Sequence, residues 1–470
     1  MINRLDILAA PEPDGATSGV WPTTLRRLDS GEFSVGGVPV GELVAEFGTP
    51  LYVLDEAEFA RRARAWKAAM EEAFADLAET DVYYAGKAFL CIAVARTAAM
   101  EGLGVDTCTE GELATALAAG VPGSRIGLHG NNKSRKEISL ALDHGIGHLV
   151  VDSLPELALV DSIAAERGVV ADVMLRVTTG VHAGGHEHIA TAHEDQKFGL
   201  SIADGAARRA VEQAVGAEHV RLTGLHSHIG SQILAVAGFR AAAEAVLRLR
   251  AEAVRELGIE IPEVDFGGGY GVRYTVLDSI PPSPAEFASI LAEAAAANVE
   301  ETGVPAPRVS IEPGRSIVGP AGMTLYTVGT IKTVEAEDGP RRYVSVDGGM
   351  SDNPRPILYG ADYTAALASR APSEGVRTRI VGKHCESGDI VVRSVSLPAD
   401  LAAGDILAVP ATGAYGRSMA SNYNHVPRPG VVAVRDGRAR WIVRRETVAD
   451  ILALDAGSVS YTHLTLPTKR

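Results

Sequence analysis

The sequence has little that suits a secreted, membrane-bound or nucleic-acid-binding protein. Its 470 residues include only three cysteines, Cys91, Cys108 and Cys385, and their odd number and wide spacing argue against a disulfide framework or a zinc site. No uncharged apolar run approaches the roughly 18 residues of a membrane span. The N-terminus shows no basic region followed by an apolar core, so no secretory signal is visible.

Basic charge is also scarce, because 59 acidic residues face 44 basic ones and give a formal net charge of −15. This balance argues against a nucleic-acid or anionic-membrane partner. A hydrophobic fraction of 46% with 22% charged residues is typical of a globular protein. We therefore expect a cytoplasmic protein with no metal, no nucleic acid and no membrane to bind.

From about residue 56, short apolar runs alternate with alanine-rich helical segments. The predicted strands are residues 81–87, 103–107, 125–131, 148–153, 172–177, 222–230, 263–269 and 308–314. The predicted helices include residues 111–120, 134–144, 155–167, 239–257 and 284–302. Such βα units indicate a parallel sheet. Eight of them favour a closed (β/α)₈ barrel of the TIM type over an open doubly wound sheet, although periodicity alone leaves both possible.

After Gly314 the pattern changes to strand-like stretches separated by turns, and helical periodicity nearly disappears. This predicts a mostly antiparallel β domain, to which residues 33–53 contribute strands. The predicted organisation is a barrel at residues 56–320 and a β domain made of residues 30–55 and 321–452. Residues 457–470 have no continuity with what precedes them, and we expect them to be disordered or foreign to the protein.

Polar side chains stand at nearly every predicted strand end, where the active site of such a barrel forms. They are Lys87, Asp106, His129, Asn131, Asp152, Arg176, His226, His228 and Glu312. Helix capping is the expected role of Asp152 and an alternative role for Asn131. Capping does not explain Lys87, which ends a strand of aromatic and β-branched residues.

Lys87 can contact a phosphate or carboxylate, form an ion pair, or provide a Schiff-base amine. The glycine loop 267–269, the Gly314–Arg315 loop and Ser231 follow neighbouring strands and can together surround a phosphate. A reactive lysine beside a phosphate site indicates either pyridoxal phosphate (PLP) or the sugar-phosphate substrate of an aldolase.

Glu312 and His228 favour PLP. A carboxylate facing the pyridine nitrogen keeps that nitrogen protonated, and the ring then withdraws electrons strongly. An imidazole such as His228 can stack on the face of the ring. The alternatives are a barrel ion pair for Glu312 and a buried core histidine for His228.

The β domain contributes polar segments of its own. Residues 385–389 place the Cys385 thiol next to a carboxylate, and a thiol near a cofactor can donate a proton, although the segment can equally be a plain turn with an inert cysteine. Residues 347–359 and 413–424 are too poor in apolar residues for strands, so we interpret them as ligand-facing loops. Arg315, Arg355 and Tyr359 can hold a substrate carboxylate.

Several ordered motifs resemble one family. They are YYAGKA around Lys87, HSHIGSQI around His228, DFGGGYG at 265–271, IEPGR at 311–315, NPRPILY at 353–359, CESGD at 385–389 and GAYGRSMASNYN at 413–424. Together they resemble the alanine-racemase-like, fold-type III PLP enzymes, and among these the diaminopimelate decarboxylase family, over residues 30 to about 450. The chain departs from the family at Thr109 and Glu110, where serine and glycine are usual.

The resemblance implies decarboxylation of meso-2,6-diaminopimelate to L-lysine and CO₂, the last step of lysine biosynthesis. Lys87 would be the Schiff-base lysine, and Cys385 the second catalytic residue, as proton donor. The implied cofactor-binding residues are Lys87, His228, Ser231, Gly269, Glu312, Pro313, Gly314, Arg315 and Tyr415. The implied substrate-binding residues are Arg315, Arg355, Tyr359, Glu386 and Tyr415. A homodimer with shared active sites is also implied, so that Cys385 and Glu386 reach the partner subunit's Lys87.

Three alternatives stay open at this point. A decarboxylase of the same fold can act on ornithine, arginine or carboxynorspermidine, but these substrates lack the second carboxylate that Arg315 and Arg355 would bind. A racemase needs two acid–base residues on opposite faces of the ring. A non-catalytic PLP-binding barrel typically lacks a β domain.

Overall fold

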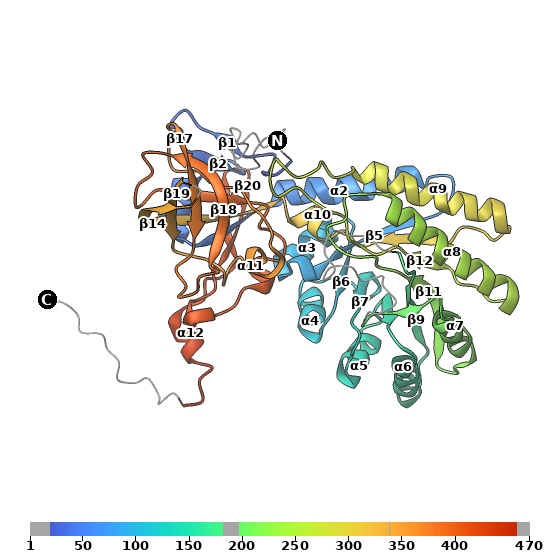
Figure 1. Cartoon of the computed structure of the whole chain (residues 1–470). Helices are drawn as coiled ribbons and strands as arrows, with labels where there is room; N and C mark the ends of the chain where they lie inside the picture. The colour runs from blue at the N-terminus through green and yellow to red at the C-terminus, as the bar shows by residue number, and fades with distance from the viewer. Residues whose placement is uncertain (1–18, 182–196, 338, 458–470) are drawn as a thin grey trace.

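The computed structural model describes residues 19–181, 197–337 and 339–457 (Figure 1). The predicted tail at 457–470 therefore lies outside the described residues, apart from Gly457. Within the described part of the chain, every helix is too short or too polar to cross a membrane.

Eight parallel strands form a closed barrel. They are β5 (Thr80–Ala85), β6 (Gly104–Thr107), β7 (Ile126–Leu128), β8 (His148–Val151), β9 (Ala171–Thr178), β11 (Val220–His226), β12 (Glu263–Asp265) and β13 (Arg308–Ile311). Each pairs in parallel with its neighbours, and the pairings of β8 with β9 and of β13 with β5 close the ring. The short β10 (Leu200–Ser201) adds to β9. The predicted (β/α)₈ barrel is confirmed.

Helices surround this ring (Figure 1). They are α2 (Glu56–Ala73), α3 (Ile92–Met100), α4 (Glu110–Ala118), α5 (Arg135–Asp143), α6 (Leu154–Arg167), α7 (Ala206–Gly216), α8 (Ala237–Leu257) and α9 (Pro284–Thr302). Side chains just before the helices fix several starts, because their oxygens accept otherwise unpaired backbone N–H groups. Ser134 and Ser283 form capping boxes with Glu137 and Glu286.

Two sequence interpretations are wrong at these helix starts. Ser153, not Asp152, caps α6, and Ser134, not Asn131, caps α5. Asp152 instead accepts a hydrogen bond from Gly199 N and lies 3.8 Å from Arg176. Several predicted strands are also too long. β13 ends at Ile311, so Glu312, Pro313 and Gly314 lie in a short loop at the barrel mouth.

A second sheet, mostly antiparallel, forms the β domain. Its strands are β4 (Leu51–Asp55), β14 (Gly322–Ala336), β15 (Gly339–Val346), β16 (Ala366–Leu367), β17 (Gly375–Val381), β18 (Ile390–Pro398), β19 (Ile406–Pro410), β20 (Val431–Arg435) and β21 (Arg438–Val443). The main order is β18-β17-β15-β14-β4-β20-β21, and β19 pairs with β14 and β16. No sequence pattern predicted β16 or β18. β4 lies between β14 and β20, which are distant in the sequence.

The segment before β4 forms a separate small sheet of β1 (Arg26–Arg27), β2 (Phe33–Val35) and β3 (Val38–Pro39), followed by α1 (Val40–Phe47). Phe33 and Val35 share a buried cluster with Met323 and Val432 of the large sheet. This segment therefore packs on the large sheet without joining it.

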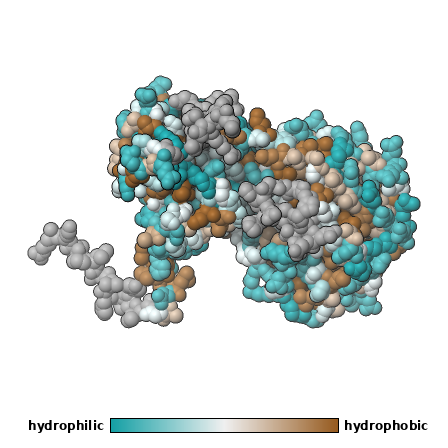
Figure 2. All heavy atoms as spheres, in the orientation of Figure 1, coloured by the Kyte–Doolittle hydropathy of each residue, from teal (hydrophilic) through white to brown (hydrophobic). Residues whose placement is uncertain are grey.

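Short helices complete the fold: α10 (Arg315–Val318), α11 (Arg355–Tyr359) and α12 (Val448–Leu452). Figure 1 shows α12 standing away from the barrel, below the β domain. Apolar residues are exposed along that segment in Figure 2, and the exposed apolar side chains include Val448 and Leu454. Grouped apolar side chains that are exposed on a monomeric protein commonly mark an interaction surface.

Candidate active site

A cavity of about 280 Å³ lies at the C-terminal ends of the barrel strands. It is lined by Ala85, Gly86, Lys87, Asp106, Cys108, His129, Gly130, Asn131, Arg176, Phe198, His226, His228 and Glu312. Three residues predicted for the cofactor, Lys87, His228 and Glu312, therefore line one cavity.

Lys87 lies in a single 3-10 turn (Gly86–Ala88) directly after β5. The turn is crowded: a Cβ on Gly86 would lie 2.6 Å from Asp106 O, and one on Gly314 would lie 2.9 Å from Ala85 O. Lys87 lies deep in the protein, and its side chain is accessible because it faces the cavity. Burial by itself lowers the pKa of Lys87, but Tyr415, Cys108 and Glu312 outweigh burial and raise that pKa above its ordinary value.

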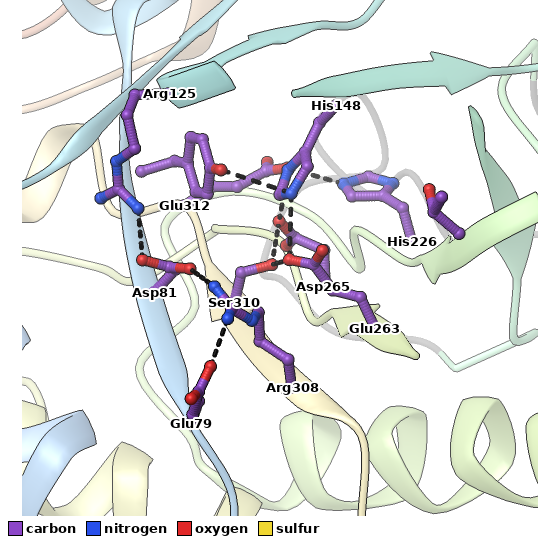
Figure 3. A network of polar contacts seen from close by, with 12 residues as sticks. Glu79, Asp81, Arg125, His148, His226, Glu263, Asp265, Arg308, Ser310 and Glu312 are labelled. Atoms are coloured by element: carbon purple, nitrogen blue, oxygen red, sulfur yellow. Dashed lines mark hydrogen bonds and ion pairs between the residues drawn. The ribbon is translucent and has the colours of Figure 1, made fainter. Parts of the chain in front are cut away.

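Glu312 is the ionised carboxylate of the cavity. Its Oε1 lies 2.8 Å from His226 Nε2 and 3.2 Å from His129 Nε2 (Figure 3 labels His226 and Glu312). Burial by itself would raise the pKa of Glu312, but the two imidazoles outweigh it and hold that pKa well below its usual range. Within the described residues, Oε1 nevertheless accepts no well-aligned hydrogen bond, so it is available to a donor in the cavity.

Asp106 and His129 lie beside this carboxylate, and burial favours the neutral form of each. Asp106 Oδ1 lies 3.4 Å from His129 Nε2. Burial, together with the charges of Glu312 and Asp265, raises the pKa of Asp106 well above its usual range, and burial lowers the pKa of His129 well below its own. The cavity floor therefore places a carboxyl group whose pKa is lowered, Glu312, beside one whose pKa is raised, Asp106.

His228 presents a neutral ring to the cavity. Gly268 N donates a hydrogen bond to His228 Nδ1 over 3.1 Å, so the ring proton sits on Nε2. Burial, with Lys87 and Arg176 nearby, lowers the pKa of His228 well below its ordinary value. A neutral, fixed imidazole is suited to stacking on an aromatic ring.

The predicted phosphate side is assembled from three loops. Arg315 Nη2 donates to Ser231 Oγ over 2.9 Å, and Arg315 also donates to Tyr274 OH. Pro313 and Gly314 are buried between these contacts and β5. Gly269 has a φ of +113°, and a Cβ there would lie 2.6 Å from Gly230 O, so this position requires glycine.

Two buried arginines extend the site toward the β domain. The Arg315 guanidinium lies 4.4 Å above the ring of Tyr415, and the Arg355 guanidinium lies 4.4 Å above the ring of Tyr274. Arg355 Nη1 also donates to Tyr363 OH over 2.9 Å. Because Tyr274 contacts both arginines, the predicted residues Arg315, Arg355 and Tyr415 form one cluster.

The loop that carries Tyr415 is fixed to the barrel at the turn of Lys87. Tyr415 N and Ser418 Oγ both donate to Ala88 O, each over 2.9 Å. The arginine cluster is therefore tied to the lysine turn through the backbone. Tyr359, the last residue of α11, is half-buried.

Cys385 and Glu386 are not brought to this cavity. Both are exposed, Cys385 N donates to Asn424 Oδ1 over 3.2 Å, and neither lines the cavity within the described chain. Thr109 and Glu110, where the chain departs from the family, follow the cavity residue Cys108 but do not line the cavity themselves: Thr109 caps α4, and Glu110 pairs at the surface with Lys136.

The cavity fits PLP on three structural grounds. The buried Glu312 Oε1 lacks an aligned donor, which a protonated pyridine nitrogen supplies. The His228 ring is flat and neutral, and an amine, Lys87, is exposed in the same cavity. One nitrogen of each of His129 and His226 and one carboxylate oxygen of Glu312 also lie within 4.8 Å of one another. Atoms this close together could contact one metal ion, or one group that donates a hydrogen bond.

Some residues of the site had no assigned role in the sequence reasoning. Asp106, His129, Arg176 and His226 stood out only as polar strand ends, and Cys108, Tyr274, Tyr363 and Asp265 were missed as functional residues. Only the position of Cys108, just after a strand end, could have drawn attention to it. Tyr274 and Tyr363 reach the arginines through folding, and no local pattern marks them.

Comparison with known proteins agrees with this geometry. Residues 56–319 match the family model described as "Pyridoxal-dependent decarboxylase, pyridoxal binding domain". The chain is 51% identical over 442 residues to the diaminopimelate decarboxylase of Mycobacterium tuberculosis (strain ATCC 25618 / H37Rv), covering 93% of this chain and 97% of the relative. It is 46% identical over 433 residues to that of Bacillus subtilis (strain 168), covering 92% and 97%.

Among solved structures, the crystal structure of diaminopimelate decarboxylase from M. jannaschii in complex with L-lysine matches with a TM-score of 0.85 at 34% identity. The match covers 92% of this chain and 97% of that one. Both sequence and fold are thus shared over nearly the full length. The chain belongs to the diaminopimelate decarboxylase family of PLP-dependent decarboxylases.

Proposed function

We propose that the chain decarboxylates meso-2,6-diaminopimelate and forms L-lysine and CO₂. The observation that carries this substrate is the pair of buried arginines, Arg315 and Arg355, joined by Tyr274 beside the cavity. A substrate with a second carboxylate gives a guanidinium its partner. Ornithine, whose decarboxylation gives a simple diamine, has no second carboxylate and so gives the guanidinium no such partner.

Lys87 Nζ would hold the cofactor covalently, Glu312 would pair with its ring nitrogen, and His228 would lie against its face. Ser231, Gly269 and the loop of residues 312–315 would bind the phosphate, the loop through its backbone and Arg315 and not through the Glu312 carboxylate. Gly267 N and Gly268 N already donate to Asp265 and His228, which leaves Gly269 as the phosphate contact of the triple glycine. When bound, PLP supplies an electron sink for the electron pair that the departing CO₂ leaves behind.

The protein's own residues prepare this chemistry. Glu312, whose pKa the neighbouring histidines lower, would hold a proton on the ring nitrogen of the cofactor, while burial disfavours a second negative charge on Asp106. Arg315, Arg355, Tyr359 and Tyr415 orient the substrate by its distal carboxylate, and Glu386 binds its distal ammonium group. The Cys385 thiol then donates the proton that replaces CO₂ on the substrate carbon.

A homodimer follows from this assignment, because Cys385 and Glu386 are exposed and do not line the cavity of their own chain. A second copy would bring them to the partner subunit's Lys87. Mixing Lys87→Ala and Cys385→Ala chains then restores one intact site per mixed dimer, about a quarter of wild-type activity for random two-fold pairing. No recovery on mixing would refute shared sites.

The three cysteines are free, which fits a reducing cytoplasm as the place of action. The division into a barrel at 56–320 and a β domain at 30–55 and 321–452 is part of this proposal. The β domain would then supply Arg355, Tyr359, Cys385, Glu386 and Tyr415 to a barrel that holds the cofactor.

The decisive assay incubates the purified protein with PLP and meso-diaminopimelate and measures lysine and CO₂. We expect both products in equal amounts, and none from Lys87→Ala. Ornithine and arginine, tested in parallel, should react poorly. A protein that binds PLP through Lys87 but forms no lysine would refute the substrate assignment and leave the fold and cofactor standing.

A further inference from the structure

Asp265 lies beneath the cavity, inside the barrel. It is the last residue of β12, its exposure is 1%, and it is not one of the residues that line the cavity. Figure 3 shows its carboxylate pointing toward Ser310 and His148 in the barrel interior. Direct contact with a cofactor is therefore not its role.

The two carboxylate oxygens of Asp265 hold two neighbouring strand ends. Oδ1 accepts a hydrogen bond from Gly267 N over 2.7 Å, at the start of the glycine loop. Oδ2 accepts one from Ser310 Oγ over 2.8 Å, two residues before Glu312. One buried side chain thus fixes the starting points of both loops.

Each of these loops places one cofactor-facing residue. Gly268 N donates to His228 Nδ1 over 3.1 Å, and Glu312 N donates to Gly267 O over 2.9 Å. The glycine loop packs tightly against the Glu312 backbone, because a Cβ on Gly268 would lie 2.3 Å from Glu312 O. A shift of Gly267 is therefore passed to both His228 and Glu312.

The surroundings of Asp265 disfavour its charge, yet a neighbouring histidine partly offsets this effect. His148 Nδ1 lies 4.0 Å from Oδ2, and His148 Nε2 lies 2.9 Å from Glu263 Oε1. Burial by itself would lower the pKa of His148, but Glu263 and Asp265 outweigh it and raise that pKa. Burial and the charge of Glu312 raise the pKa of Asp265 to about 6, which still leaves it ionised above that pH.

We propose that Asp265 is a positioning residue of the active site, which holds His228 and Glu312 in register with each other through the glycine loop and Ser310. This rests on the proposed function, in which His228 and Glu312 face the PLP ring. The competing explanation is a carboxylate that only stabilises the barrel. The two explanations differ in one respect. Only if Asp265 is a positioning residue does its removal change the binding and the environment of PLP in a protein that still folds.

The test compares Asp265→Ala, Asp265→Asn and Thr223→Val in the full chain. Thr223→Val is the matched control, since it removes a hydroxyl that donates to Val173 O over 3.0 Å in the same barrel wall. The measurements are the dissociation constant of PLP, the circular dichroism of bound PLP, and kcat and KM for diaminopimelate at saturating PLP.

We expect Asp265→Ala to weaken PLP binding at least about tenfold, because two hydrogen bonds to a charged group are lost. The circular dichroism of bound PLP should change, and kcat should fall while KM stays within about twofold, since Asp265 does not face the substrate. Asp265→Asn should lie between wild type and Asp265→Ala, because its amide oxygen can still accept from Gly267 N. Thr223→Val should match wild type.

Suppose that Asp265→Ala equals Thr223→Val in PLP affinity and circular dichroism and differs only in a lower melting temperature. That result would overturn this inference and leave the proposed function standing. If Asp265→Ala does not fold, Asp265→Asn decides: weaker PLP binding than Thr223→Val supports the positioning role, and equal binding overturns it. Wild-type protein that binds no PLP through Lys87 would overturn the proposed function and this inference together.

Discussion

Lys133 supports the loops at the barrel mouth from below, through an ion pair that is almost fully buried. Its Nζ donates to Glu156 Oε1 over 2.7 Å, to Gly130 O over 2.7 Å and to Val150 O over 2.5 Å. The side-chain exposures of Lys133 and Glu156 are 1% and 8%. Burial lowers the pKa of Lys133, opposed by Glu156.

Replacing Lys133 by methionine leaves the Glu156 carboxylate buried without its counter-charge and removes one donor from each of two carbonyl oxygens. Breaking a buried pair in this way costs about 3–5 kcal/mol. At about 2–4 °C per kcal/mol for a unit of this size, the melting temperature should fall by roughly 6–20 °C. Scanning calorimetry of the PLP-bound protein measures this directly.

Lys136→Met is the matched control. Lys136 pairs with Glu110 over a similar 2.6 Å, but the two side chains are 74% and 44% exposed. Such a pair contributes about 0–1 kcal/mol. The double variant Lys133→Met/Glu156→Gln should be more stable than Lys133→Met, because the glutamine carries no charge and its oxygen still accepts from Asp152 N. Equal melting temperatures for Lys133→Met and Lys136→Met would refute the reasoning from burial.

Three further outcomes are expected. Arg355→Ala should raise KM for diaminopimelate by about 10- to 100-fold through loss of a charge-assisted contact; steady-state kinetics test this, and an unchanged KM would remove the specificity argument. Gly268→Ala should weaken PLP binding at least about tenfold, since the added Cβ would overlap Glu312 O and overpacking costs about 1–3 kcal/mol; fluorescence titration showing wild-type affinity would contradict this. Hydrogen bonds from Arg428 lower the pKa of Glu446 to about 2 from an ordinary 4.5, so the carboxylate stabilises the fold above that ordinary value and the benefit is lost as pH falls toward 2. Glu446→Gln should therefore melt below wild type at pH 7, with a gap that narrows on acidification; a gap independent of pH would contradict the assignment.

The barrel and the main chemistry of the site were predictable because their signals are local. Short apolar runs followed by amphipathic helices are visible within a window of twenty residues, and eight repeats of this pattern favour a closed ring. Lys87 and Glu312 each end or follow such a run, so their meeting at one face follows from the barrel itself. The motifs around them identified the family without any knowledge of distances.

Other features depended on contacts between distant segments. Strand lengths at the barrel mouth were overestimated because no local signal marks the last residue of a ladder: β13 ends at Ile311, before Glu312 and Gly314. The helix-capping role given to Asp152 failed because Arg176 and Gly199, from another part of the chain, approach it. β4 could not be placed between β14 and β20 from its own five residues, since strand partners are chosen by packing across the whole sheet.

The sequence by itself determined the fold class, the cofactor lysine, the carboxylate opposite it and the glycine loops, because each is written in residue types at short spacing. Only the tertiary structure decided which carboxyl group is charged, which arginines share Tyr274, and that Asp265 links two loops from beneath. These properties arise from burial and from distances through space. Burial and distance are set only when segments hundreds of residues apart have packed together.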